Sequence, residues 1–243
     1  MRTLGVLGGM SWESTAVYYR LINLGVAQRL GGLHSAPLLL HSVDFAPIAA
    51  LQAAGDWQQA GKLLASAAAG LRAAGAQALV LATNTMHKVA RQIEAGSGLP
   101  LLHIADATGA AVQAAGFGQV LLLGTRYTME DDSIVRGRLQ QRAGAQVQVP
   151  GAEDRALLQR VIFEELCRGI VIPASRAEVV ALIARHKAQG AQAVILGCTE
   201  LMLLLDDSNS PLPTFDSTTL HAAAAVRWML GLTTNIHIPE TAP

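Results

Sequence analysis

The chain repeats part of its own sequence, and this repeat limits its fold more than any other feature. The segment G-A-Q-A-L-V-L-A-T-N-T-M, which begins at Gly75, matches G-A-Q-A-V-I-L-G-C-T-E-L, which begins at Gly190, with an offset of 115 residues throughout. A second match at nearly the same offset pairs T-L-G-V-L-G-G-M-S at Thr3 with Q-V-L-L-L-G-T-R-Y-T at Gln119. Two matches in phase indicate two similar halves.

Each half alternates apolar runs of strand length with Ala-rich and Leu-rich stretches of helix length. This is the βαβ pattern of a mainly parallel sheet, so we predict an α/β fold of two similar parallel-sheet domains. The predicted strands are Thr3–Leu7, Pro37–Val43, Ala78–Ala82, Leu101–Ile104, Val120–Leu123, Ala145–Val149, Ala193–Gly197 and Pro213–Phe215. The predicted helices are Trp12–Leu30, Trp57–Ala74, Met86–Glu94, Ala105–Ala115, Glu130–Arg142, Glu153–Arg168, Ala174–Gln189 and Thr218–Leu230.

The predicted helix at the end of the chain suggests how the two domains are divided. We expect residues 1–103 plus 214–243 to form the first domain and residues 104–213 the second, because this last helix can pack back on the first half. Ligands of parallel α/β sheets bind beyond the carboxyl ends of the strands. The repeat therefore predicts that Thr83 and Cys198, which follow corresponding strands, lie beside one cleft.

Composition excludes several classes of protein. With 51% hydrophobic residues, the 243-residue chain can bury a substantial core. Its 18 basic and 18 acidic residues cancel and form no basic run, so nucleic acid is not an expected partner. The sequence has no recognisable signal peptide or bilayer-spanning run, and we expect a cytoplasmic protein with no membrane partner. Cys167 and Cys198 should then be free thiols.

Cys198 is the first candidate for chemistry. It lies where a predicted strand gives way to a helix, and free N–H groups and the helix dipole lower the pKa of a thiol at such a position. A small thiolate base is the functional interpretation, and a buried structural cysteine is the alternative. Cys167, near the end of a predicted helix, lacks such a setting and is expected to serve packing.

Polar residues follow the matching strand of the first half. The hydroxyls, amide and backbone N–H groups of Thr83, Asn84 and Thr85 suit a carboxylate, and capping of the next helix is the alternative role. Two further turns, Gly8–Ser11 and Gly124–Thr128, are expected at the same cleft. Glycine in these turns permits close approach of the backbone to a small ligand.

Cofactor and metal motifs are missing from the sequence. It contains neither G-x-G-x-x-G nor a Walker motif, its histidines do not form H-E-x-x-H, and no Cys pair is spaced to hold zinc. We expect His87 and His221 to be helix residues with local partners. A pyridoxal enzyme needs a Schiff-base lysine, and Lys88, the lysine near the expected cleft, has no recognisable phosphate cradle beside it.

Several ordered motifs carry a family resemblance. They are L-G-V-L-G-G-M-S-W-E-S-T near the start, H-S-V-D-F from His41, T-N-T-M-H from Thr83, G-T-R-Y-T-M from Gly124 and G-C-T-E-L from Gly197. With them the sequence closely resembles the aspartate/glutamate racemase family over essentially its whole length. The resemblance implies two α/β domains related by a pseudo-twofold axis, an active site in the cleft between them, no cofactor and a homodimer. It also implies racemisation of an acidic amino acid, aspartate or glutamate or both, by removal and return of the α-proton.

The chain departs from the family at one expected catalytic position. The family has a cysteine at both strand ends, whereas this chain has Thr83 at the first and Cys198 at the second. Carried over, Cys198 is the base that removes the α-proton of the L-enantiomer, and Thr83 is the acid on the D side. The expected substrate contacts are Met10, Gln52, Asn84, Thr85, Thr125, Thr128, Thr199 and Glu200, with Asn84, Thr85 and Thr199 holding the α-carboxylate. Gln52 lies near the position where relatives anchor the side-chain carboxylate of the substrate. Its amide is uncharged, which weakens a prediction of strict aspartate specificity.

Other functions also fit a single cysteine. Two alternatives lie within the enzyme class. One is a relative that protonates one face of an enediolate, such as an arylmalonate decarboxylase, and the other is a maleate isomerase, in which a cysteine attacks the substrate. A cleft that binds a solute without turnover is the alternative from another class. If the chain is a racemase with Thr83 opposite Cys198, we expect L-substrate to exchange its α-hydrogen faster than it inverts.

Overall fold

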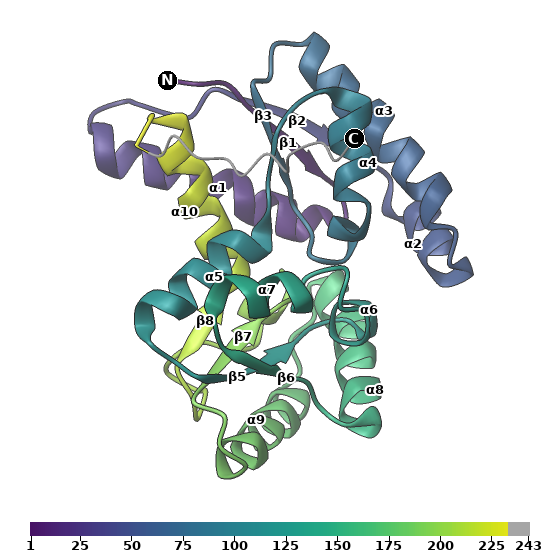
Figure 1. The fold of residues 1–243 in the computed structure, drawn as a ribbon, viewed down its shortest axis with the longest axis vertical. Helices are drawn as coiled ribbons and strands as arrows, with labels where there is room; N and C mark the ends of the chain where they lie inside the picture. The colour runs from purple at the N-terminus through teal and green to yellow at the C-terminus, as the bar shows by residue number, and fades with distance from the viewer. Residues whose placement is uncertain (233–243) are drawn as a thin grey trace. The chain divides into compact units, whose positions relative to one another are not determined.

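The computed structural model describes residues 1–232, which form two compact units (Figure 1). Unit 1 contains residues 1–82 and 89–103 and resumes at Ala222, and unit 2 contains residues 83–88 and 104–221. Within residues 1–232, no helix combines the length and apolar character needed to cross a bilayer.

Unit 1 is built on a parallel sheet of four strands in the order β2-β1-β3-β4. Its strands are β1 (Leu4–Gly8), β2 (Leu38–Ser42), β3 (Ala78–Leu81) and β4 (Leu101–Leu102), and its helices are α1 (Trp12–Leu30), α2 (Phe45–Ala54), α3 (Trp57–Ala73), α4 (Ala90–Ser97) and most of α10 (Ser217–Met229). Helices α1 and α10 cover one face of the sheet, where Tyr18, Ile22 and Val226 are fully or almost fully buried against β1 and β3 (Figure 1).

Unit 2 repeats this plan with a parallel sheet in the order β6-β5-β7-β8. Its strands are β5 (Gln119–Leu123), β6 (Gln146–Gln148), β7 (Ala193–Leu196) and β8 (Thr214–Asp216), and its helices are α5 (Ile104–Ala115), α6 (Arg126–Glu130), α7 (Arg136–Ala143), α8 (Ala152–Arg160) and α9 (Pro173–Ala188). Alternate residues of β5 and β7 enter different cores, one closed by α5 and α7 and the other by α8 and α9. Strands buried on both faces read as continuous apolar runs, which is why the sequence shows them clearly.

The matching strand orders explain the sequence repeat. The repeated segments contain β1 and β3 in unit 1 and β5 and β7 in unit 2, and each pair occupies the two central places of its sheet. The prediction of two similar parallel-sheet α/β units is therefore confirmed, and all eight predicted strands are present. The pseudo-twofold axis and the cleft between domains stay predictions.

Four helical segments differ from the sequence prediction. Helix α2, between Asp44, whose side chain caps its start, and Gly55 in the left-handed conformation, was not predicted. The predicted helix Glu130–Arg142 is divided into α6 and α7, because the Asp131 carboxylate accepts the Ser133 N–H in a turn between them. The predicted helix Met86–Glu94 begins as a 3-10 helix, and Glu153–Arg168 continues past α8 as a π-helix over Val161–Glu165 and then a 3-10 turn.

The compact units differ from the expected domains in two segments. Strand β8 pairs with β7, so residues 214–221 join unit 2 although we expected them in the first domain. Residues 83–88 also join unit 2, since Thr85 hydrogen-bonds to Thr125 there. The second unit thus contains polar residues from both repeated segments.

Candidate functional site

Three strands of unit 2 end at one edge of its sheet. Because β5, β7 and β8 are parallel neighbours, the residues that follow them, Thr125, Cys198 and Ser217, lie along the carboxyl edge of the sheet. The segment of residues 83–88 packs in the same unit. The site is therefore described within unit 2.

Cys198 is held by a buried carboxylate. Its Sγ donates to Oε2 of Glu200 at 3.0 Å, and the Thr199 hydroxyl donates to the same oxygen at 2.8 Å. All three residues are at most 5% exposed. Two donors on one oxygen fix the Glu200 carboxylate against the thiol.

The expected lowering of the Cys198 pKa is wrong. Burial raises the pKa of this thiol well above its ordinary value, and the Glu200 charge, the nearby Cys167 and the hydrogen bond to Glu200 raise it further. The backbone N–H of Glu200 does donate to the sulfur and lowers the pKa, as argued from the strand end, but this contribution is the smallest. The helix that follows is only the 3-10 turn Leu201–Leu203, and the expectation ignored the carboxylate two residues along the chain.

Cys167 lies closer to this chemistry than its sequence suggested. It packs against the apolar core that contains Cys198, which agrees with the expected packing role. Burial raises its pKa, and the Glu200 charge and a hydrogen bond to the Glu200 carboxylate add to this effect. Sequence spacing gave no signal for this contact, because Cys167 and Glu200 meet only through the folding of unit 2.

Three threonine hydroxyls meet beside the thiol-bearing strand. Thr85 Oγ1 lies 3.0 Å from Thr125 Oγ1 and 3.5 Å from Thr128 Oγ1, and the last two are 3.2 Å apart. Thr125 also caps helix α6 by accepting the Thr128 N–H, and all three residues are at most 6% exposed. The structure thus brings together a cluster of donors that the sequence placed in different halves.

Asn84 is oriented by a serine that the sequence analysis did not single out. Its Nδ2 donates to Ser217 Oγ at 3.2 Å, and the Ser217 hydroxyl donates to the Leu196 carbonyl at 2.6 Å. The Asn84 side chain is 3% exposed, and among the described residues its Oδ1 has no hydrogen-bond partner. Ser217 could not be found from motifs, since it begins α10 directly after the short strand β8, outside both repeats.

His87 holds the backbone of Thr83. Its Nδ1 donates to the Thr83 carbonyl at 2.8 Å, and its Nε2 accepts the Ile104 N–H at 3.3 Å. A carbonyl can only accept and an N–H can only donate, so the imidazole is neutral with its proton on Nδ1. The expectation of a local partner is confirmed for His87, and its ring lies 5.9 Å from that of His221 on α10.

The two remaining predicted contacts belong to unit 1. Met10 follows β1 and is 4% exposed, and Gln52 lies on α2 and is 5% exposed. Eight of the ten predicted site residues are therefore in unit 2 and two are in unit 1. Across residues 1–232, no three His, Cys, Asp or Glu side chains gather as ligands for a metal ion.

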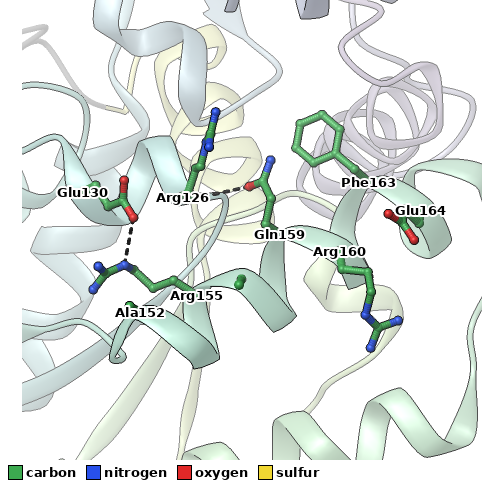
Figure 2. A pocket seen from close by; sticks show the side chains of 9 residues that line it. Arg126, Glu130, Ala152, Arg155, Gln159, Arg160, Phe163 and Glu164 are labelled. Atoms are coloured by element: carbon green, nitrogen blue, oxygen red, sulfur yellow. Dashed lines mark hydrogen bonds and ion pairs between the residues drawn. The ribbon is translucent and has the colours of Figure 1, made fainter. Parts of the chain in front are cut away.

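A hollow of about 400 Å³ in unit 2 is lined by residues of α6, of α8 and of the π-helix that follows α8 (Figure 2). Figure 2 shows Gln159 reaching from α8 to Arg126, whose backbone N–H donates to Gln159 Oε1 at 2.9 Å. Beside it, Arg155 pairs with Glu130 at 2.9 Å. These contacts tie α8 to both ends of α6, so the wall of this hollow braces the helix that Thr125 caps.

The fold and the site define an α/β protein of two repeated parallel-sheet units, with a buried thiol and hydroxyls at a strand edge. A family model described as Asp/Glu/hydantoin racemase matches residues 7–225. The chain belongs to this family of racemases, which are isomerases.

Solved structures agree with this assignment. A Yersinia pestis protein assigned to the Asp/Glu racemases is 52% identical, with a TM-score of 0.87, over 95% of this chain and 100% of its own. An aspartate racemase homologue from Pyrococcus horikoshii is 31% identical, with a TM-score of 0.76, over 96% of this chain and 99% of its own. The aspartate racemase of Picrophilus torridus, at 19% identity and a TM-score of 0.76 over 95% of each chain, shares the fold.

Proposed function

We propose that the chain racemises an acidic amino acid, aspartate or glutamate or both, without pyridoxal phosphate. Cys198 serves as the base on the L side and Thr83 acts on the D side. The observation that carries the proposal is the 3.0 Å hydrogen bond from the Cys198 thiol to the buried Glu200 carboxylate. It supplies a group that can take the thiol proton where the thiolate alone is disfavoured.

The first step is the formation of the base. A buried thiol with a raised pKa is protonated at neutral pH, so Cys198 must lose its proton before it can attack an α-C–H bond. Glu200 accepts that proton along the existing hydrogen bond, and the thiolate then removes the α-proton of the L-enantiomer. Thr83 gives its hydroxyl proton to the opposite face and regains one from water, while Glu200 releases its proton to water, so every group returns to its resting state. Thr199 keeps the carboxylate in place through its own hydrogen bond.

The second requirement is stabilisation of the carbanion. An amino-acid α-carbon is a much weaker acid than a thiol, so negative charge must move onto the α-carboxylate as an enediolate. Preorganised donors in a dry site stabilise such charge by several kcal/mol. We assign this role to the hydroxyls of Thr85, Thr125 and Thr128, and substrate contacts in unit 1 to Met10 and Gln52.

The two faces of the substrate are served unequally. A threonine hydroxyl is a poor acid and base at neutral pH, so Thr83 relays protons slowly compared with a thiol. Enantiomers are equally stable, and a racemase must therefore have equal kcat/KM in both directions. The asymmetry then appears in exchange: L-substrate returns from the carbanion through Cys198 more often than it proceeds to D.

The test is a chiral assay of L- and D-aspartate and L- and D-glutamate in deuterated water. We expect L-substrate to incorporate deuterium faster than it inverts, and Cys198→Ala to lose both activities by several orders of magnitude. Equal rates of exchange and inversion from the L-enantiomer contradict the role of Thr83. Racemisation that survives in Cys198→Ala contradicts the role of the thiol.

Parallel assays separate the other functions of a single-cysteine site. Release of carbon dioxide from an aryl malonate indicates a decarboxylase, isomerisation of maleate indicates a maleate isomerase, and binding of amino acids without inversion indicates a binding protein. We also propose a cytoplasmic location, from the sequence, and a homodimer, from the family resemblance; sedimentation of the purified protein tests the dimer.

A further inference from the structure

The proposed chemistry places protons in a closed part of unit 2. After the α-proton has moved to Cys198, the thiol and the Glu200 carboxyl each hold a proton, and these two residues are 5% and 3% exposed. Deuterium enters L-substrate only if the abstracted proton leaves for solvent while the carbanion still exists. The site therefore needs a path for protons between Glu200 and the surface.

Cys167 lies between the Glu200 carboxylate and solvent. Its thiol hydrogen-bonds to this carboxylate, and it packs against the apolar core that contains Cys198. Cys167 is partly exposed, unlike the buried Cys198 and Glu200. The next residue along the chain, Arg168, is exposed. Cys167 thus contacts the buried carboxylate and also reaches solvent.

An irregular stretch of helix carries Cys167. The chain continues from α8 as a π-helix over Val161–Glu165 and then tightens to a 3-10 turn over Leu166–Arg168. The buried Glu165 carboxylate holds this stretch to the start of α9, because its Oε1 accepts the Ser175 hydroxyl at 3.0 Å. Short π-helical segments of this kind are frequent at functional sites. The turn that carries the partly exposed thiol is therefore fixed within unit 2.

A thiol can pass a proton on, because sulfur both donates and accepts weak hydrogen bonds. While Glu200 is ionised, Cys167 donates its S–H to the carboxylate. Once Glu200 has taken the Cys198 proton, the direction can reverse. The carboxyl proton then moves to the Cys167 sulfur while the S–H proton of Cys167 passes to a surface water. Glu200 is again a carboxylate, Cys167 is again a neutral thiol, and the water has become a hydronium ion.

We propose that Cys167 is the relay residue through which Glu200 exchanges its proton with solvent, so that the α-proton of L-substrate leaves through Cys198, Glu200 and Cys167 in turn. The inference rests on the proposed function and deepens it. A deuteron from solvent returns to L-substrate by the same path. The D-enantiomer instead takes its proton from Thr83, so exchange and inversion depend on different side chains.

The first test is a matched pair of substitutions. Cys167→Val removes the relay at similar size, whereas Cys167→Ser keeps a hydroxyl that can donate and accept. In deuterated water, we expect Cys167→Val to lower the ratio of deuterium incorporation to inversion from L-aspartate or L-glutamate by about tenfold or more. The abstracted proton then returns to the carbon as protium. Cys167→Ser should keep most of the wild-type ratio.

Two further variants control for packing and for folding. Val180→Ala removes packing from the same apolar core without removing a thiol, so it should leave the ratio unchanged. Cys167→Ala also lacks a relay and should lower the ratio as Cys167→Val does, which keeps the test open if valine does not fit. A ratio that stays at the wild-type value in both, or that falls as far in Cys167→Ser, overturns the inference.

The second test needs no substrate. The chain has two cysteines, so in Cys167→Val and Cys167→Ser the remaining S–H band in the infrared spectrum belongs to Cys198. After transfer to deuterated water, we expect this band to exchange more slowly in Cys167→Val than in Cys167→Ser by about tenfold or more. Equal exchange in the two variants overturns the inference. Slower exchange in Cys167→Val, in a protein whose wild type does not racemise, overturns only the proposed function.

Discussion

A single oxygen of Glu200 receives both the Cys198 thiol and the Thr199 hydroxyl. At the scale of the residue, this carboxylate has two opposite effects on the thiol. Burial is the main cause of the raised pKa of Cys198, and the Glu200 charge raises it further, so the resting thiol is protonated. The same charge makes the carboxylate the nearest acceptor for that proton when the substrate is in place. The thiol of Cys198 is therefore a weak acid at rest, but it can still act as a base because Glu200 can take its proton.

Glu200→Gln tests these two effects of the carboxylate on the Cys198 thiol. The amide oxygen can still accept the thiol hydrogen bond, but it carries no charge and cannot take the proton. We expect the pKa of Cys198 to fall, so that alkylation of the thiol begins at lower pH, while kcat falls by about 100-fold or more and KM changes little. Glu200→Asp should recover part of kcat. A variant whose kcat rises as its thiol becomes more acidic contradicts the role of Glu200 as proton acceptor.

Residue chemistry was only partly predictable from the sequence. Cys198, Thr85 and Thr125 could be found because each follows a strand end of the repeat. The raised pKa of Cys198 could not, since it depends on burial and on side chains that meet only in the folded unit. His87 was read as a helix residue with a local partner, yet the atom that it holds, the Thr83 carbonyl, is visible only in the structure.

At the scale of the element, α5 and α7 are joined by an ion-pair network of three residues. Asp106 on α5 receives two hydrogen bonds of 2.6 Å from Arg138 and one of 3.1 Å from Arg142, both on α7. Burial raises the pKa of this carboxyl, but the two arginines outweigh it and hold the pKa below its ordinary value of 3.8. These helices close one of the two cores of unit 2.

Asp106→Asn should lower the free energy of unfolding by about 1–2 kcal/mol at neutral pH, because it removes charged hydrogen bonds from a partly buried site. A carboxyl with a depressed pKa stabilises the fold above pH 3.8 and loses this contribution as the pH falls through the folded pKa. Urea titrations from pH 7 downward should therefore show the full difference at pH 7 and a shrinking difference as the pH falls below 3.8. Asp154→Asn is the control, since its ion-pair partner Arg185 is half exposed, and its loss should be smaller.

Helix boundaries show where sequence patterns fail for elements. Apolar periodicity predicted the ends of α1 and α9 to within one residue, because long helices contain many apolar residues at helical spacing. It predicted α6 and α7 as one helix, because the break between them depends on the Asp131 turn and not on a loss of helix-forming residues. It missed α2, which is ten residues long and is defined mainly by its two caps.

At the scale of the whole molecule, both cysteines have pKa values raised by burial and by Glu200. In the unfolded chain their thiols ionise near the ordinary value of 9.0. A raised folded pKa contributes stability that is fully present below the unfolded value and is lost as the pH rises toward the folded value. The thiols therefore make the fold sensitive to alkali.

Above pH 9, the free energy of unfolding should fall by up to about 1.4 kcal/mol per pH unit for each of the two thiols. The double variant Cys167→Ala and Cys198→Ala should lack this part of the alkaline slope, although it is less stable at pH 7 through lost packing. Urea titrations of both proteins between pH 7 and pH 10.5, under reducing conditions, measure the two slopes. Parallel slopes contradict the protonated state of the buried thiols.

The whole architecture was predictable to a greater extent than any site detail. The in-phase repeat predicted two sheets, and the corresponding strands indeed occupy corresponding places in the orders β2-β1-β3-β4 and β6-β5-β7-β8. The sequence did not predict that residues 83–88 and 214–221 belong to unit 2. Their place follows from the hydrogen bond between Thr85 and Thr125 and from the pairing of β8 with β7.

The contacts among Thr85, Thr125 and Thr128 have a consequence for how the site responds to changing charge. In each of the three close pairs, either oxygen can be the donor. Rotation about a C–O bond reverses the direction of each hydrogen bond while every heavy atom stays in place. The cluster can thus turn its protons inward when a ligand gains negative charge and return them to one another when that charge disappears. The three hydroxyl dipoles can therefore reorient toward a changing charge, as water molecules do, although the site is closed to water and its backbone stays fixed.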